Sequence, residues 1–201
     1  MRVQKDRKWE ENQMNHAGTV TLETERLKLR ALVPEDVTAM FDNWAKEEEV
    51  TKFLTWPTHT SAEVTKEVLN SWMKEYGKKD FYQWGIELRA IKQVVGTISV
   101  VHIKEDIKEV EIGYCIGSKF WNQGIMSEAL KEIMRFFFEE VKVNRITARH
   151  DTNNPNSGHV MRACGLKFEG IHLQGDINNT GVCDVAVYGL VADDYIWIKS
   201  Q

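Results

Sequence analysis

The sequence predicts an α+β fold, built on a mixed and mostly antiparallel sheet of about seven strands flanked by about four helices. Three observations point to it. The patterns along the chain follow the order β-α-α-β-β-β-α-β-α-β-β, the three central strands have connections short enough for hairpins, and one later pair of strands is joined by a helix. A helical crossover makes that pair parallel. The 201 residues, 42% of them hydrophobic, suffice for one domain and are few for two.

The N-terminal third has one alternating stretch and two helical ones. TLETERLKLRAL alternates apolar and charged residues from Thr21, as a half-buried strand does, and ends before Pro34. Pro34 suits the first position of a helix, which the apolar spacing continues to about residue 48. A second helix opens at Thr60, where T-S-A-E has the spacing of a capping box, and stops at Gly77. The linker between the two helices, KFLTWPTH, is unusually apolar for a loop.

The remaining elements supply most of the sheet. Apolar residues at steps of three and four predict an amphipathic helix after Gly124, and a further short helix begins around Asn154 and ends at Gly165. The strand before the long helix and the strand after it are the parallel pair. The predicted strands are FYQWGIEL (81–88), VVGTISVVHI (94–103), EVEIGYCIG (109–117), NRITARH (144–150), KFEGI (167–171) and VCDVAVYGLV (182–191).

Composition and charge argue against several classes of protein. The net charge is -4 and the sequence pI is near 5.9, whereas non-specific polyanion binders usually have a clearly basic surface. No apolar run approaches the roughly 20 residues of a membrane span, and residues 1–17 lack the apolar centre of a signal peptide. We therefore expect a cytoplasmic protein without nucleic-acid or membrane partners, with residues 1–17 as a flexible tail and 18–201 as one domain.

The cysteines and histidines do not form a recognisable metal site. Cys115, Cys164 and Cys183 are an odd number at wide spacing, which fits neither a disulfide framework nor CxxC-type zinc pairs. We expect them to be buried thiols. His150 and His159 lack a matching set of Cys, Asp or Glu ligands, so no metal is expected.

The stretch EIGYCIGSKFWNQGIMSEAL (111–130) passes from a strand into a helix through one glycine, Gly124. The first helical N–H groups in such a turn have no carbonyl partners, and the helix dipole favours an anion there. The amides of residues 123–127 and the hydroxyl of Ser127 could bind a phosphate, which the bare glycine allows to approach. The alternative is that Gly124 only shapes a tight turn. The stretch is not a nucleotide P-loop, because Ile125 rather than Lys follows the glycine.

The same stretch resembles the acetyl-CoA signature of the GNAT superfamily of N-acetyltransferases, in particular its ribosomal-protein-alanine (RimJ/RimL-type) branch. Three further stretches match in the family's order: TERLKLRALVPEDV (24–37), NPNSGHVMRACGLKFEG (154–170) and NNTGVCDVAVYGL (178–190). The resemblance covers roughly residues 20–195. It implies a GNAT-type acyl-CoA N-acyltransferase fold, with parallel strands near 109–117 and 143–150 that splay apart, and acetyl-CoA as the co-substrate.

The resemblance also implies where acetyl-CoA binds. The family's pyrophosphate loop, Gln/Arg-x-x-Gly-x-Gly/Ala, falls on residues 121–126, where Trp121 replaces the polar first residue and Met126 replaces a small one. Because the family's contacts there are mostly through backbone amides, these departures need not abolish binding, although Met126 would narrow the cleft. Asn154 and Ser157 match positions that face the pantetheine arm and the sulfur, with an ordinary helix cap as the alternative. The residues expected to bind acetyl-CoA are Ile116, Trp121, Asn122, Gln123, Gly124, Ile125, Met126, Ser127, Asn154 and Ser157.

Acetyl transfer to an amine needs a neutral nitrogen and a polarised thioester carbonyl. The resemblance points to Glu111 as the general base, and the alternative for Glu111 is a structural carboxylate. Glu87, in the neighbouring strand, is the second candidate. For the carbonyl, the resemblance implies the backbone amide of Cys115, where the strand splays from its neighbour.

The leaving thiolate must also be stabilised. Many relatives have a Tyr as general acid at the position of Met161, so we expect Ser157 or a water to take this role. The thiol pKa is roughly 8.5 by analogy with Cys, and only modest help is needed. Tyr114 and Tyr188 are the next candidates.

The apolar linker is the expected acceptor site. Phe53, Leu54 and Trp56 lie in the segment that covers the acceptor in the family, and Glu87 is grouped with them as a substrate-binding residue. Packing of this loop onto the core is the alternative.

The pKa values of amines favour one kind of acceptor. An α-amino group with a pKa near 8 is roughly 10 to 20% neutral at neutral pH, whereas a lysine is well under 1% neutral. We therefore expect a protein or peptide N-terminus, attacked directly in a ternary complex without a covalent enzyme intermediate. A small amine, such as an antibiotic or a polyamine, and a non-catalytic acyl-CoA-binding module are the alternatives. The protein is expected to be a monomer or a homodimer.

Overall fold

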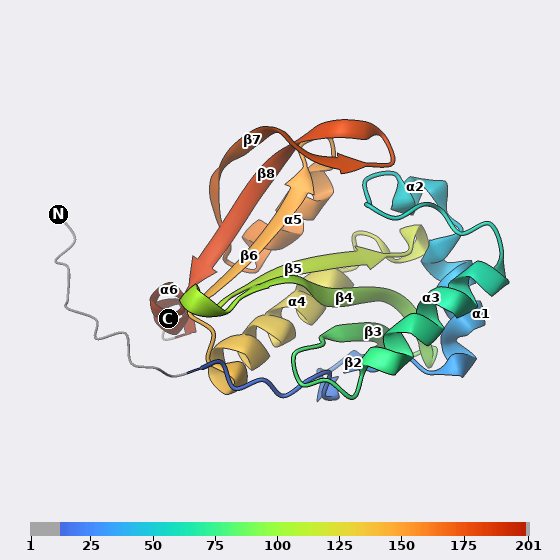
Figure 1. Cartoon of the computed structure of the whole chain (residues 1–201), viewed down its shortest axis with the longest axis horizontal. Helices are drawn as coiled ribbons and strands as arrows, with labels where there is room; N and C mark the ends of the chain where they lie inside the picture. The colour runs from blue at the N-terminus through green and yellow to red at the C-terminus, as the bar shows by residue number, and fades with distance from the viewer. Residues whose placement is uncertain (1–12, 200–201) are drawn as a thin grey trace, which may run out of the picture.

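The computed structural model describes residues 13–199, which form an eight-stranded sheet in the order β1-β2-β3-β4-β5-β6-β8-β7 (Figure 1). Every neighbouring pair is antiparallel except β5 and β6. The strands are β1 (Leu22–Glu23), β2 (Leu27–Arg30), β3 (Gln83–Leu88), β4 (Gln93–Lys104), β5 (Glu109–Ile116), β6 (Arg145–Asp151), β7 (Lys167–Asn178) and β8 (Gly181–Val191). The predicted α+β class and the single parallel pair are confirmed.

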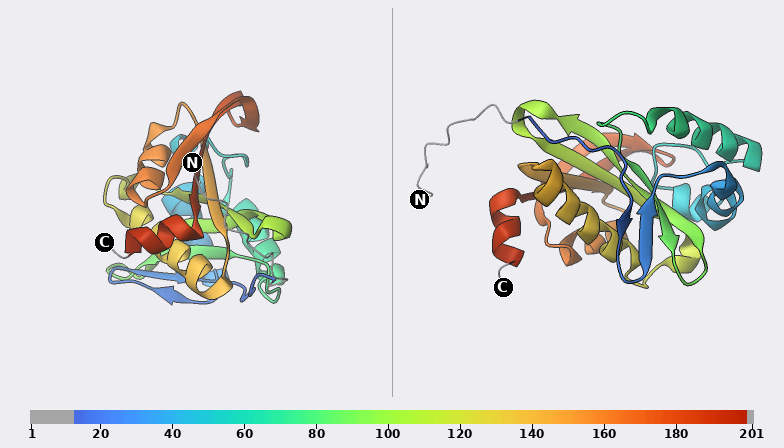
Figure 2. Two further views of the ribbon diagram at one scale, coloured as in Figure 1. Left: turned by 90° about the vertical axis from the view of Figure 1, so that its left-hand side faces the viewer. Right: turned by 90° about the horizontal axis from the view of Figure 1, so that it is seen from below.

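Helices cover both faces of the sheet. The α-helices are α1 (Val37–Met40), α2 (Glu48–Thr51), α3 (Ala62–Glu75), α4 (Ile125–Phe136), α5 (Pro155–Ala163) and α6 (Ala192–Lys199). In β4, Val94 packs in a cluster with α1 and α3, whereas Val95 packs in the larger cluster that contains α4 and α5. Successive strand residues face opposite sides, so α3 and α4 lie on opposite faces of the sheet (Figure 2).

The parallel strands β5 and β6 pair over only three residues, from Glu109 opposite Arg145 to Glu111 opposite Thr147. Beyond that point β5 follows β4 to Ile116, while β6 follows β8. The two strands therefore diverge, as Figure 1 shows. The predicted splay is confirmed, and it opens the sheet at the end where α4 and α5 begin.

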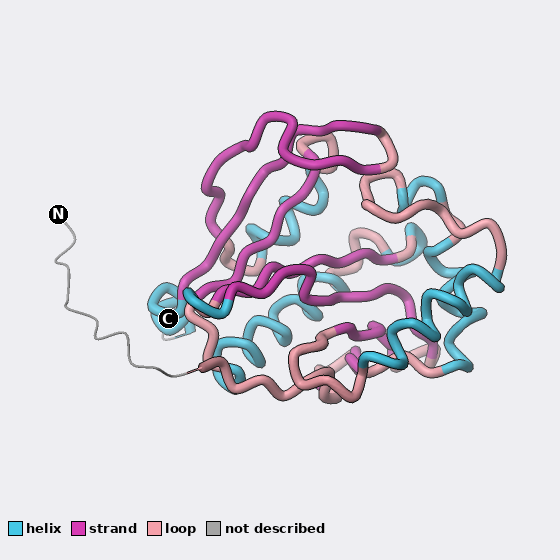
Figure 3. The backbone as a smooth tube through the Cα atoms, in the orientation of Figure 1, coloured by secondary structure: helices cyan, strands magenta, loops and turns pink. Residues whose placement is uncertain are grey.

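The turn of the β7–β8 hairpin spans this opening and meets the loop after α2 (Figure 3). Asn179 makes the contact: its backbone N–H donates to the Leu54 carbonyl at 3.2 Å, and its Nδ2 donates to the carbonyls of Thr51 at 2.9 Å and Trp56 at 2.8 Å. These hydrogen bonds join the loop 52–61 to the turn between β7 and β8.

Several predicted boundaries are wrong. The stretch from Thr21 forms two short strands, β1 and β2, instead of one. The helix predicted from Pro34 to about residue 48 is broken into a 3-10 turn, η1 (Pro34–Asp36), then α1, a π-helical turn, η2 (Phe41–Ala45), and a separate α2. The cap of α3 is Ser61 instead of Thr60.

The predicted flexible tail also needs correction. Its residues 1–12 lie outside the described part of the chain. Residues 13–17 pack on the domain: Met14 is 5% exposed in the main core, the Asn15 amide donates to the Val141 carbonyl at 2.8 Å, and His16 bonds to the Tyr82 hydroxyl at 2.9 Å. The core buries the apolar side chain of Met14. The polar composition of the segment gave no indication of this contact.

Candidate functional site

Two cavities meet where β5 and β6 diverge, each of about 390 Å³. The helix-side cavity lies against the beginnings of α4 and α5, and the strand-side cavity lies against β4, β5, β6 and the loop 52–61. Residues that line both are Leu54, Tyr114, Cys115, Asn154 and Ser157. Two different ligands could therefore reach the same point from opposite sides.

The turn before α4 contains two left-handed residues. Asn122 (φ 58) and Gly124 (φ 71) are left-handed, and α4 begins at Ile125. The Glu128 amide donates to the Gly124 carbonyl at 3.0 Å, so the amides before it have no partner within the helix. The residues of this turn that line the helix-side cavity are Trp121, Asn122, Gly124, Ile125, Met126 and Ser127.

Three side chains of this turn take different positions relative to the cavity. Gln123 turns away from the cavity, and its Nε2 donates to the Lys119 carbonyl at 2.8 Å. The Trp121 Nε1 donates to the Ile116 carbonyl at 2.9 Å, which fixes the indole at the cavity wall. Met126 lines the cavity but is only 5% exposed, so most of its volume belongs to the core and little of it narrows the cleft.

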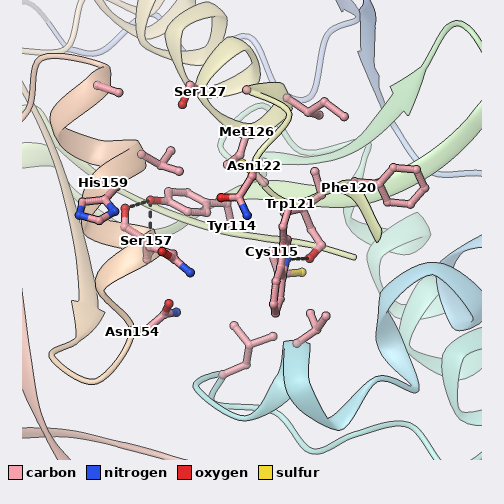
Figure 4. Close-up of a pocket in the computed structure, with 18 residues that line it drawn as sticks. Tyr114, Cys115, Phe120, Trp121, Asn122, Met126, Ser127, Asn154, Ser157 and His159 are labelled. Carbon is pink, nitrogen blue, oxygen red and sulfur yellow. Dashed lines mark hydrogen bonds between the residues drawn. The ribbon is translucent and has the colours of Figure 1, made fainter. Parts of the chain in front are cut away.

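Ser157 and Tyr114 form a hydrogen-bonded pair at the junction of the cavities (Figure 4). The Tyr114 hydroxyl donates to the Ser157 carbonyl at 2.9 Å and accepts from Ser157 Oγ at 3.2 Å. Burial raises the pKa of the Tyr114 phenol. Asn154 is the N-cap residue of α5 but its side chain makes no capping hydrogen bond, which leaves it facing the junction. Met161 is 1% exposed in the core and does not reach this point.

The strand-side cavity contains the predicted base. Glu111 lines it, and the Glu111 Oε1 forms an ion pair with Arg149 Nε at 2.8 Å, while Arg149 Nη2 lies 3.4 Å from Asp176 Oδ2. Tyr188, a fallback candidate, lines neither cavity, and its hydroxyl accepts from Arg162 Nη1 at 2.7 Å.

Glu87 is not part of the site. Its Oε2 accepts from Arg30 Nε at 2.6 Å, and Arg30 also binds Asp36 through Nη1 at 2.7 Å. Glu87 lines neither cavity. The prediction of a substrate-binding or basic role for it is wrong, because this carboxylate joins β3 to the start of the first helical segment.

The backbone at Cys115 also differs from the expectation. The Gly117 amide donates to the Val95 carbonyl at 3.0 Å, and Cys115 is opposite Thr97 in the same register. Hydrogen-bonded pairs recur every second residue in an antiparallel ladder, so the Cys115 amide points toward β4. The Ile116 carbonyl, bonded to Trp121, points the other way. The amides of Ile116 and, by the same alternation, Tyr114 therefore face the opening, and the structure argues against the role predicted for the Cys115 amide.

The apolar linker borders the strand-side cavity. Phe53, Leu54 and Trp56 line the strand-side cavity, together with Trp72 of α3. The contacts of Asn179 hold the carbonyls of this loop, so its side chains have a fixed position over the cavity.

Sequence reasoning missed Asp151, at the end of β6. It lines the strand-side cavity, is 5% exposed, and accepts from the Asn153 amide at 2.8 Å and from Asn178 Nδ2 at 2.7 Å. Burial alone would raise the pKa of this carboxyl, but the hydrogen bonds from Asn153 and Asn178 outweigh burial and lower it. Its place directly before TNNPNS, at the C-terminal end of a strand, is the signal that could have found it.

Within residues 13–199, no group of three or more His, Cys, Asp or Glu side chains could hold a metal ion. In the same part of the chain, none of the helices has the length and apolar character needed to cross a membrane.

Comparison with known proteins gives the same family that the sequence resembles. Residues 26–167 match the family model described as an acetyltransferase (GNAT) domain. The chain is 30% identical over 170 residues to the uncharacterized N-acetyltransferase YoaA of Bacillus subtilis, which covers 85% of this chain and 96% of that protein. It is 29% identical over 101 residues to the ribosomal-protein-serine acetyltransferase of Escherichia coli, covering 50% of this chain and 56% of that one.

A solved structure shares the fold. RimL, a ribosomal L7/L12 alpha-N-protein acetyltransferase in complex with coenzyme A, superimposes with a TM-score of 0.77 at 24% identity, covering 87% of this chain and 99% of that one. This likeness agrees with the mixed sheet of the described residues, and the family model matches residues 26–167. The chain therefore belongs to the GNAT family of acetyltransferases and is an N-acetyltransferase.

Proposed function

We propose that the protein transfers the acetyl group of acetyl-CoA directly to a free α-amine, most readily the N-terminus of a peptide or protein, in a ternary complex. The observation that supports this proposal is the junction of the two cavities at Tyr114, Cys115, Asn154 and Ser157. A thioester reaching this point from the helix side and an amine reaching it from the strand side would meet without a covalent enzyme intermediate.

The helix-side cavity is the proposed site of acetyl-CoA. The free amides between Gly124 and Ser127 would bind its pyrophosphate at the positive end of α4. The amides of Tyr114 and Ile116, which face the opening, take the place of the Cys115 amide as donors to the pantetheine arm and the thioester carbonyl. The free side chain of Asn154 would contact the same arm.

Ser157 and Tyr114 are the proposed partners of the leaving thiolate. Because burial raises the pKa of Tyr114 while a thiol has a pKa of roughly 8.5, the phenol cannot give up its proton to the thiolate at equilibrium. Once released from the Ser157 carbonyl, the Tyr114 hydroxyl donates a hydrogen bond to the thiolate, and the thiolate is protonated afterwards by the bulk solvent, because neutral pH lies below the pKa of the thiol. Ser157 and Tyr114 would thus take the role of the tyrosine that many relatives have at the position of Met161.

Glu111 remains the proposed proton acceptor. Arg149 pairs with one carboxylate oxygen, Oε1, and the other oxygen would take the proton of the attacking amine, directly or through a water. An α-amine is roughly 10 to 20% neutral at neutral pH, so it makes smaller demands on this residue than a lysine does. The likeness to acetyltransferases named for ribosomal proteins supports a protein N-terminus and the RimJ/RimL-type branch as the proposed identity of this chain.

A small polycationic amine is a second candidate acceptor, because the strand-side cavity is acidic. Glu111, Asp151 and Asp176 line it with Arg149 as their one cationic neighbour among the residues that line the cavity. Such a charge balance favours cationic acceptors over anionic ones.

Calorimetric titration with acetyl-CoA, followed by thiol release on adding amines, tests the proposal. The panel contains peptides with free N-termini, the same peptides with blocked N-termini, and spermidine. Tight binding with release that depends on the free N-terminus is expected. Release with spermidine alone would select the second candidate, and no binding of acetyl-CoA would contradict the proposed cofactor site.

A further inference from the structure

Arg26 lies outside both cavities, just before β2, and holds the turn that precedes α4 from behind. Its Nη1 donates to the Gln123 carbonyl at 3.0 Å, and its Nε donates to Glu128 Oε2 at 2.6 Å. The Arg26 amide and the Thr24 hydroxyl both donate to Glu128 Oε1, at 3.1 and 2.5 Å. One guanidinium thus joins the turn to the first part of α4.

The contact with Gln123 has a consequence for the next residue. In a trans peptide the C=O of one residue and the N–H of the next point in opposite directions. Since Arg26 holds the Gln123 carbonyl, the Gly124 N–H must point away from Arg26. Gly124 lines the helix-side cavity and Arg26 does not, so this amide is turned toward the cavity.

The turn has an intrinsic reason to need such support. Asn122 is left-handed at φ 58, a conformation that few non-glycine residues adopt, and Gly124 follows at φ 71. Gln123 lies between them, and its carbonyl accepts from a charged donor, which makes a stronger hydrogen bond than a neutral one. Arg26 therefore fixes the peptide plane at the centre of the turn.

The positive charge of Arg26 also offsets the negative charge of Glu128 near the turn. Glu128 lies in the first turn of α4, where its carboxylate would repel a bound pyrophosphate. Burial alone would raise the pKa of Glu128, but hydrogen bonds from Thr24 and Arg26 outweigh burial and lower it, so the carboxylate is ionised at neutral pH. The ion pair with Arg26 offsets that negative charge. A Cβ built on Gly124 would lie 3.6 Å from Arg26 Nη2, so the guanidinium is directly behind the glycine.

We propose that Arg26 is a positioning residue for the pyrophosphate of acetyl-CoA: it holds the Gln123 carbonyl out of the helix-side cavity, turns the Gly124 amide into it, and neutralises Glu128. The proposal rests on the proposed function, in which this turn binds the pyrophosphate. Arg26 acts through the turn, so its loss should weaken ligands that contain the pyrophosphate and leave others unchanged.

Coenzyme A and pantetheine separate these ligands, because pantetheine lacks the pyrophosphate and the nucleotide. Binding of each is measured by calorimetry, or by competition for the weaker ligand, with wild type, Arg26→Gln, Arg26→Lys and a matched control, Arg135→Gln. Arg135 lies on α4, the helix that contains Glu128, and forms ion pairs with Glu132 and Glu140. Unfolding midpoints are recorded for all four proteins.

Arg26→Gln is expected to bind coenzyme A at least tenfold more weakly than wild type, and pantetheine within twofold. Arg26→Lys keeps the charge without the forked geometry, so it should recover part of the loss. Arg135→Gln should bind both ligands as wild type does.

Other outcomes overturn the inference in distinguishable ways. Wild type that binds coenzyme A no better than pantetheine would contradict the proposed pyrophosphate site, and the role of Arg26 with it. A normal preference of wild type for coenzyme A that Arg26→Gln retains would reject the role of Arg26 alone. Equal weakening of both ligands would show that Arg26 only supports the fold. A selective loss that Arg26→Lys does not reduce would reject the part that charge neutralisation of Glu128 has in the proposal.

Discussion

Replacing Tyr114 by Phe tests the proposed contact with the leaving thiolate. The substitution removes two hydrogen bonds with Ser157, one at 2.9 Å to its carbonyl and one at 3.2 Å from its Oγ. At about 0.5–1.5 kcal/mol each, the free energy of unfolding should fall by about 1–3 kcal/mol. For a chain of this length each kcal/mol lowers the unfolding midpoint by about 2–4 °C.

Tyr114→Phe should also slow turnover. A hydrogen bond to a charged group contributes about 1.5–3 kcal/mol, so losing it in the transition state should slow acetyl transfer about 10- to 150-fold. The rate is measured as thiol release in a single turnover, so that product release does not hide the chemical step. Binding of acetyl-CoA should change little, because the helix-side cavity keeps the ring.

Tyr188→Phe is the matched control. Tyr188 is 3% exposed and also loses a hydrogen bond, from Arg162 Nη1 at 2.7 Å, but it lines neither cavity. It should lower the unfolding midpoint and leave the single-turnover rate within twofold of wild type. If Tyr114→Phe transfers acetyl groups at the wild-type rate, the thiolate has another partner and the assignment is refuted.

Three further predictions follow from contacts around the cavities. Asn179→Ala frees the loop 52–61 and should raise the KM of the acceptor several-fold, up to about tenfold, with a smaller change in acetyl-CoA affinity; an unchanged acceptor KM would contradict it. Asp151 has a lowered pKa in the folded state, so its ionised form stabilises the fold above about pH 4 and this stabilisation is lost as the pH falls through the lower folded pKa. The free energy of unfolding, measured in urea, should therefore fall less for Asp151→Asn than for wild type between about pH 5 and 3. An equal fall for the two proteins would contradict this prediction. Gly117→Ala places a Cβ 1.9 Å from the Asn43 carbonyl oxygen and should cost about 1–3 kcal/mol, whereas Gly113→Ala meets only a movable Val101 side chain at 2.8 Å and should cost less; equal unfolding midpoints would contradict the difference.

Local patterns predicted the elements that build the cleft. The hairpins of β3, β4 and β5 follow from short connections, and the parallel pair follows from the helical crossover. The lone glycine before α4 forms the tight turn that the sequence indicates, because a turn with a left-handed residue at its end needs the conformational freedom of glycine. These features depend on residues close together in the chain.

The features that could not be predicted from the sequence depend on contacts between residues far apart in the chain. Glu87 in β3 and Glu111 in β5 are both strand carboxylates, with β4 between them in the sheet, but Arg30 holds the first outside the site and Arg149 pairs with the second in the strand-side cavity. The direction of the Cys115 amide depends on a register with β4 that the sequence does not reveal. Asp151 gains its importance from Asn178, which is 27 residues away in the chain.

The measurement that tests the central claim most directly is the position of the acetyl group on one peptide that has both a free N-terminus and a lysine. The peptide is incubated with the protein and acetyl-CoA at neutral pH, and fragment masses locate the acetyl group. The account predicts acetylation of the N-terminus, with none on the lysine and none on a matched peptide whose N-terminus is blocked. Acetylation of the lysine, or of spermidine in preference to both peptides, would contradict it.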